Sequence, residues 1–147
     1  MMKTTILSEY GFHEALLGMG LSHGKTSGIT SLWDIRDDAS LKERALKLAG
    51  LGKGHDKFLR MIVVTLDITA PLYWWKQFDT YKIGTVAQSE STMHTLMKKP
   101  LTPEMFEGGL FPDLVRSLNV VGKQDGFETL NRCLPQSFLQ RRIVQAK

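Results

Sequence analysis

The pattern of apolar and polar residues along the chain predicts a mixture of strands and helices. Residues 61–68 are rich in β-branched side chains and apolar on both faces, apart from Thr65 and Asp67, which indicates a buried strand. A shorter strand is expected at residues 4–7. Apolar residues at helical spacing then predict a helix over residues 12–19. Elements of both kinds favour a mixed α and β protein.

Local start and stop signals predict further helices. Ser40 and Glu43 form a capping box at the start of a helix over residues 40–48. Pro71 is expected to begin a second helix, which ends near Gly84, because the missing N–H of proline is harmless in the first turn. More helices are expected from Thr102 onwards, over residues 112–119 and over residues 125–132. No repeat or linker divides the chain, so we predict one domain over residues 1–147.

Aromatic residues crowd the helix that begins at Pro71. Trp74 and Phe78 share one face of this helix, whereas Trp75 lies to the side. We therefore expect the helix to be buried on two sides, within the core or in a subunit contact. Stacking of a nucleotide base on these rings is a second interpretation that the spacing leaves open. The segment that follows, residues 85–95, is polar and has little apolar drive of its own.

The composition is typical of a globular protein. Of the 147 residues, 42% are hydrophobic and 23% are charged, close to the globular average. No apolar run approaches the roughly 18–20 residues that a membrane span needs, and the first residues lack a signal-peptide core. Cys133 is the single cysteine, so no internal disulfide can form. We expect a cytoplasmic protein that has no membrane partner.

The charge and the short motifs restrict the candidate chemistry. The net charge is +4 and the basic residues are spread thinly, which favours an anionic ligand such as a nucleotide and argues against a nucleic-acid surface. His23-Gly24-Lys25-Thr26 lacks the glycine that a phosphate-binding loop needs at position 19. The four histidines lack the spacing of zinc ligands, so we predict no metal site.

One stretch resembles a known family. The sequence GHDKFLRMIVVTLDITAPLY, residues 54–73, contains a Gly-His dipeptide, a strand and an Ala-Pro helix start. The same features occur in this order in flavin-dependent thymidylate synthases. The similarity continues to Thr85, and a shorter match links Leu134-Pro135 to Arg141. The resemblance implies an α+β fold with a central antiparallel sheet flanked by helices. It also implies dUMP as substrate, FAD as cofactor, and homotetramers whose sites lie between subunits.

The signature of that family is largely replaced in this chain. Thr80-Tyr81-Lys82 stand where the family has Arg-His-Arg, and Glu90 occupies the position of a serine. The chain also stops soon after Arg141, where the family continues into a helix with more cofactor and nucleotide ligands. We therefore expect a catalytically silent relative without a cofactor. Short relatives of this kind resemble bacteriophage proteins.

Four residues are predicted to line a nucleotide pocket: Gln77, Lys82, Gln88 and Arg141. The resemblance implies that Gln77 faces a base edge and that Arg141 binds nucleotide, while Lys82 keeps a charge without the planar fork of arginine. The expected function is to bind or sequester a nucleotide-like ligand, or to act through assembly as a homo-oligomer, a tetramer by analogy. The alternative is a divergent FAD-dependent thymidylate synthase that methylates dUMP. In the simplest structural interpretation, Gln77 is an ordinary polar helix residue and Arg141 belongs to a solvated basic tail.

Overall fold

Two compact units make up the computed structural model of the chain. The first unit comprises residues 1–6 and 66–145, and the second comprises residues 7–65 and 146–147. The described part of the chain is residues 1–22, 24, 31, 35 and 38–147. Each unit has buried hydrophobic clusters of its own. The single domain predicted over residues 1–147 stays a prediction.

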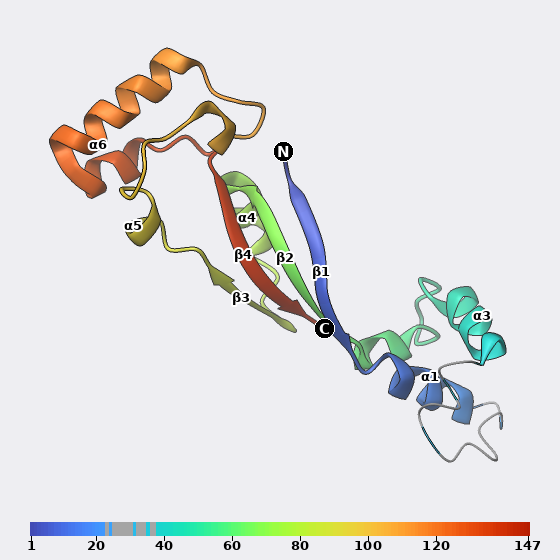
Figure 1. Ribbon diagram of the computed structural model, residues 1–147. Coiled ribbons are helices and arrows are strands. Elements are labelled where there is room, and N and C mark those ends of the chain that lie inside the picture. Colours follow the sequence, from blue (N-terminus) through green and yellow to red (C-terminus); the bar gives the residue numbers. More distant parts are fainter. Residues whose placement is uncertain (23, 25–30, 32–34, 36–37) are drawn as a thin grey trace. The chain divides into compact units, whose positions relative to one another are not determined.

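A four-stranded antiparallel sheet in the order β1-β2-β4-β3 organises the fold (Figure 1). Its strands are β1 (Lys3–Tyr10), β2 (Val63–Pro71), β3 (Thr85–Ser89) and β4 (Leu139–Ala146). The sheet and its helices confirm the predicted α+β class with a central antiparallel sheet flanked by helices. Because β2 and β4 occupy the middle of the sheet, their side chains are more buried than those of the edge strands β1 and β3.

The strand predicted over residues 61–68 exists, but it begins two residues later and extends to Pro71. Lys57–Met61 instead forms a short 3-10 helix, η1, which is stabilised by backbone hydrogen bonds of the turn type. The reason is Phe58, which is only 5% exposed and packs into the core of the second unit. Burial of this ring holds the segment in a tight turn, so the extended run starts only after it.

Helix α4, Leu72–Phe78, packs against the sheet and is shorter than predicted. The sequence predicts an end near Gly84, whereas the chain leaves the helix after Phe78. Thr80 ends it, because the Thr80 N–H and Oγ1 both donate to the Gln77 carbonyl, at 3.1 and 2.7 Å. The inner face of α4 forms a cluster with β2 and β4 whose fully buried members are Ile68, Ala70, Trp75 and Val144.

The described part of the second unit contains helices and turns besides its strand residues. Its longer helices are α1, Phe12–Leu21, and α3, Ala39–Leu48. Asp38 caps α3 in place of the predicted Ser40, because Asp38 Oδ1 accepts hydrogen bonds from the N–H groups of Ser40 at 2.8 Å and Leu41 at 3.1 Å. The predicted capping box is therefore wrong in register. The tetrapeptide at residues 23–26 lies outside the described residues, apart from Gly24.

Residues 85–95, for which the local pattern predicts no element, form β3 and α5. Strand β3 is held by pairing with β4, a partner that is distant in sequence and therefore invisible to local patterns. The remaining elements are α5 (Thr92–Thr95), η2 (Pro103–Met105) and α6 (Pro112–Cys133). Helix α6 joins the two helices predicted after Pro112, and Gly126, at φ 80° and ψ −174°, marks the kink between them. No described helix is long and apolar enough to cross a membrane.

Candidate functional site

Trp75 fixes α4 onto β4. Its side chain is buried, and its Nε1 donates to the carbonyls of Ala70 at 3.1 Å and Gln140 at 3.0 Å. The guanidinium carbon of Arg142 lies 4.3 Å from the centroid of the Trp75 ring, within the range of a cation–π contact. Arg142 Nη1 also lies 2.8 Å from the carboxylate of Asp79. This network commits Arg142 to holding α4 against the sheet.

Arg141 lies on the opposite face of the sheet from Arg142, because successive residues of a strand alternate between faces. Its Nε lies 2.9 Å from Asp67 Oδ1 and its Nη2 lies 2.6 Å from Asp67 Oδ2, which makes a bidentate ion pair. The hydrogen bond and charge of Arg141 lower the pKa of the Asp67 carboxyl, and Asp67 in turn raises the pKa of Arg141. Arg141 Nη1 has no partner among the described residues, so one edge of the guanidinium is available to a ligand.

A hollow of about 390 Å³ lies beside Arg141. It is lined by Gln88, Ser89, Glu90, Arg141, Arg142 and Ile143. The Glu90 N–H donates to the Arg141 carbonyl at 2.9 Å, and Gln140 Nε2 donates to the Glu90 carbonyl at 3.1 Å, so the end of β3 is fixed beside β4. Arg141, Gln88 and Glu90 thus bring a guanidinium, an amide and a carboxylate to the lining of the hollow. We call it the β3–β4 hollow.

The four residues predicted for a nucleotide pocket do not share one hollow. Gln88 and Arg141 both line the β3–β4 hollow. Lys82 lines a separate hollow of about 220 Å³, beside Asp79. Gln77 is exposed on α4, where its carbonyl accepts the hydrogen bonds that end the helix. The structure thus brings two of the four side chains together, and the nucleotide-binding role of all four stays a prediction.

The three positions where the resemblance implies Arg-His-Arg have local roles in this chain. Thr80 ends α4, as described above. The ring of Tyr81 lies 6.5 Å from the ring of Phe78 and is largely exposed. Lys82 carries a compact ammonium, which cannot reproduce the bidentate geometry of a guanidinium. These positions therefore supply one cation, and that cation lies away from the β3–β4 hollow.

Asp67 and Arg142 hold the site together through their ion pairs, but the sequence pattern predicts this role for neither of them. Asp67 appears as a polar exception in an apolar strand, and Arg142 appears as half of a basic doublet. Period-two alternation along β4 would have separated Arg141 from Arg142. That signal could not be used, because no strand is predicted at residues 139–146.

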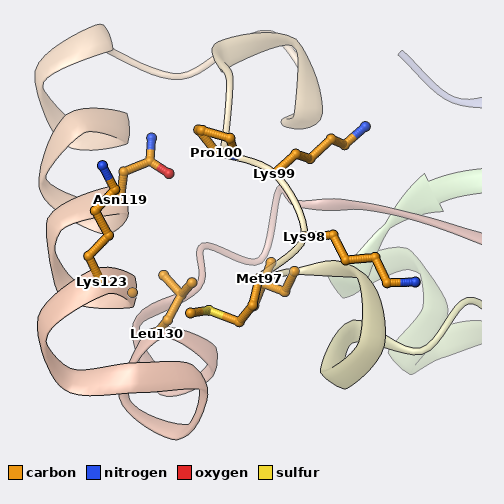
Figure 2. A pocket seen from close by; sticks show the side chains of 9 residues that line it. Met97, Lys98, Lys99, Pro100, Asn119, Lys123 and Leu130 are labelled. Carbon is orange, nitrogen blue, oxygen red and sulfur yellow. The ribbon is translucent and has the colours of Figure 1, made fainter.

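A second basic region lies between α6 and the segment that follows α5 (Figure 2). Its hollow measures about 140 Å³. Figure 2 shows the side chains of Lys98 and Lys99 extending away from Leu130, so their charges do not converge. The Asn119 amide is already used, because it accepts from the Leu101 N–H at 2.7 Å and donates to the Leu101 carbonyl at 3.0 Å. We interpret this region as a structural contact.

The residues of the β3–β4 hollow do not fit a flavin dinucleotide. Diphosphates are bound through several N–H donors or cations. Here the hollow offers the free edge of Arg141 next to the negative charge of Glu90. Its volume lies near the lower end of the range of ligand pockets, roughly 300–1,000 Å³. Within the described part of the chain, no group of three histidine, cysteine or acidic residues is placed to hold a metal ion.

Comparison with known proteins identifies the class of fold. No family model and no curated protein matches this sequence. Thymidylate synthase X from Helicobacter pylori, solved with FAD and dUMP, is similar over 98% of this chain and 77% of that chain, at 9% identity and a TM-score of 0.68. A second structure of the same enzyme, complexed with FAD and dUMP, matches 98% of this chain and 78% of that chain, at 10% identity and a TM-score of 0.71.

A UMP/dUMP methylase from Streptomyces cacaoi, bound with 5-Br UMP, is similar over 100% of this chain and 72% of that chain. Its identity is 12% and its TM-score is 0.53. These likenesses define the class of structure: the chain has the fold of flavin-dependent thymidylate synthases, as the resemblance over residues 54–85 predicts. At such low identity the likeness establishes the fold, and function has to be argued from the residues of the site.

Proposed function

We propose that this chain binds a nucleoside monophosphate or a similar nucleotide-like ligand and does not catalyse thymidylate synthesis. The observation that carries the proposal is the β3–β4 hollow, in which Asp67 holds the guanidinium of Arg141 with Nη1 free. The fold adds support, because solved proteins with the same fold are named as bound to dUMP or 5-Br UMP.

The chemistry of the β3–β4 hollow matches the parts of a mononucleotide. The free edge of Arg141 can donate two hydrogen bonds to a phosphate group, and the pairing with Asp67 holds that edge in a fixed orientation. The Gln88 amide can both donate and accept, which suits the edge of a base. Glu90 can accept hydrogen bonds from ribose hydroxyls. Because Glu90 lies beside Arg141, its carboxylate repels a phosphate there and lowers the affinity that Arg141 can supply.

The absence of catalysis is inferred from the residues that replace the family signature. A charge-assisted hydrogen bond contributes roughly 1.5–3 kcal/mol. Losing two or three arginine contacts therefore removes about 4–8 kcal/mol of anion binding, or about three to six decades of affinity, before non-additivity is considered. Thr80 and Tyr81 cannot supply such contacts, and the hollow containing Arg141 does not fit FAD. The chain keeps the scaffold and one anion contact, which supports binding without flavin chemistry.

Isothermal titration calorimetry against mononucleotides, dinucleotides and cyclic nucleotides tests this function. We expect binding of at least one nucleoside monophosphate, and weaker binding of the corresponding nucleoside because it lacks the phosphate. Absence of a binding signal for every nucleotide at millimolar concentration would disprove the proposal.

The alternative function is a divergent FAD-dependent thymidylate synthase that methylates dUMP. The two functions differ in colour, because a flavin enzyme is yellow when purified with its cofactor. We expect purified protein, mixed with excess FAD and then desalted, to retain no flavin absorbance. Retained flavin together with dUMP-dependent oxidation of NADPH would establish the alternative.

We further propose that the chain forms a homo-oligomer, with four copies as the expected number. The observation in its favour is that edge strands of the sheet carry exposed apolar side chains, including Ile6 on β1 and Val86 on β3. Light scattering coupled to size-exclusion chromatography measures the number directly. A mass near 16.6 kDa at micromolar concentration would show a monomer and contradict this part of the proposal.

A further inference from the structure

The second unit contains a cavity of about 680 Å³, larger than each of the hollows described above. It is lined by residues of α1, α3 and η1 and of the loop before η1. The residues that line it and matter here are Gly18, Met19, Arg44, Leu48, Lys57 and Phe58. All of them belong to the second unit, whereas the β3–β4 hollow belongs to the first. Nothing in the proposed nucleotide binding uses this cavity.

The inner wall of the cavity is apolar. Met19 is 6% exposed and Phe58 is 5% exposed, and both belong to the core cluster of the second unit, against which Leu48 packs. Methionine adapts its shape to an apolar ligand, and Met61 adds a second thioether at the side of the cavity. A volume of this size lies within the range of pockets that enclose small organic ligands. The cavity therefore suits a ligand with an apolar body.

Among the described residues that line the cavity, the charged side chains are those of Arg44 and Lys57, and none is an aspartate or glutamate. The Lys57 side chain is exposed, and its ammonium has no partner among the described residues. Ser22 also lines the cavity, but its hydroxyl donates to the Met19 carbonyl at 2.8 Å. Charge complementarity therefore favours an anionic head group that meets Lys57.

We propose that this cavity binds an amphipathic anion, a carboxylate or a sulfonate on an apolar chain or ring. The apolar part lies against Met19, Leu48 and Phe58, and the anionic group lies at Lys57. Apolar contact supplies most of the affinity, because the effect scales with the buried apolar area, and the cation selects the sign of the head group. This site is independent of the nucleotide site, so either can be present without the other.

Calorimetric titration of the full chain with dodecanoate below its micelle concentration tests the site. Dodecyltrimethylammonium has the same apolar tail and the opposite charge, and is therefore the matched control ligand. We expect dodecanoate to bind about tenfold or more tightly than the cation. Equal binding of the two ligands, or no binding of dodecanoate, would overturn the proposal. Excess UMP should leave dodecanoate binding unchanged, which keeps this test separate from that of the nucleotide site.

Two variants locate the ligand. Lys57→Glu should weaken dodecanoate binding about tenfold or more, whereas Lys42→Glu, an exposed change on α3 outside the cavity lining, should leave it within about twofold. Gly18→Leu should abolish binding by filling the cavity, since among the described residues a Cβ built at Gly18 meets the Met61 Sδ alone, at 3.5 Å. Circular dichroism verifies that each variant is folded. Unchanged binding in folded Gly18→Leu, or displacement of dodecanoate by micromolar FAD, would overturn the assignment.

Discussion

Replacement of Trp75 by phenylalanine should destabilise the first unit far more than the same change at the neighbouring Trp74. The Trp75 Nε1–H is shared between the carbonyls of Ala70 and Gln140, at 3.1 and 3.0 Å, and both would lose this donor within the core. Loss of the donor costs about 1–2 kcal/mol, the weakened cation–π contact with Arg142 about 0.5–1 kcal/mol, and the void left by the smaller ring about 1 kcal/mol. The expected loss is therefore about 2.5–4 kcal/mol.

Trp74→Phe is the matched control, because it makes the same chemical change one residue earlier on α4. Trp74 is half-buried, and its ring stacks on Phe78 with 5.1 Å between centroids, a contact that a phenylalanine can keep. We expect a loss of about 1 kcal/mol or less for this variant. Urea unfolding followed by circular dichroism measures both free energies without relying on tryptophan fluorescence. Equal losses in the two variants would refute the argument that Trp75 holds α4 to β4.

Three further predictions concern single contacts. Gly11→Ala should cost several kcal/mol of unfolding free energy, because its Cβ would lie 2.3 Å from the Met61 carbonyl oxygen. Gly50 has the same φ of 81° but no atom of the described residues within 4 Å of its Cβ position, so Gly50→Ala should cost about 1 kcal/mol in urea unfolding. Asn119→Leu should cost about 1–3 kcal/mol of unfolding free energy, because the backbone N–H and carbonyl of Leu101 both lose their amide partner. The control Asn131→Leu, on the exposed side of α6, should be nearly neutral by thermal unfolding. A larger loss for Asn131→Leu than for Asn119→Leu would contradict the role of Asn119. Pairing with Arg141 lowers the pKa of Asp67 in the folded protein. The pair therefore stabilises the fold at pH values above the ordinary aspartate pKa, and this stabilisation is lost as the pH falls through the folded pKa. Asp67→Asn should therefore flatten the dependence of unfolding free energy on pH as the pH falls below the ordinary aspartate pKa, and an unchanged slope would contradict the assignment.

The elements that could be predicted from the sequence are those whose own residues determine them. The β-branched run that becomes β2 and the helical spacing that becomes α1 are both local signals, and both elements occur within a few residues of the predicted positions. Strand β3 could not be predicted, because its polar residues are held in place by β4, which is distant in the sequence. The end of α4 at Phe78 depends on Thr80, a cap that only the folded backbone reveals.

In the candidate site, too, the residues can be named from the sequence, whereas their partners depend on the folded sheet. Gln88 and Arg141 meet in one hollow, but the reason is strand pairing rather than any motif in the sequence. The sequence alone allows Arg141 to be interpreted, with Arg142, as part of a solvated tail. The alternation of β4 instead gives the two arginines different faces and different partners, Asp67 for Arg141 and Asp79 for Arg142. Local sequence cannot specify such partners, because an ion pair between distant strands exists only once the sheet has formed.

The affinity of UMP for the wild-type chain and for Arg141→Gln, measured by calorimetry, tests the central claim most directly. Glutamine keeps a polar side chain in the strand but removes the guanidinium edge that should bind phosphate. We predict that the wild type binds UMP and that Arg141→Gln binds it about tenfold to a hundredfold more weakly. Arg132→Gln, which removes an exposed charge on α6, should change the affinity less than about twofold. Equal affinity of wild type and Arg141→Gln would contradict the claim that Arg141 in the β3–β4 hollow binds the nucleotide.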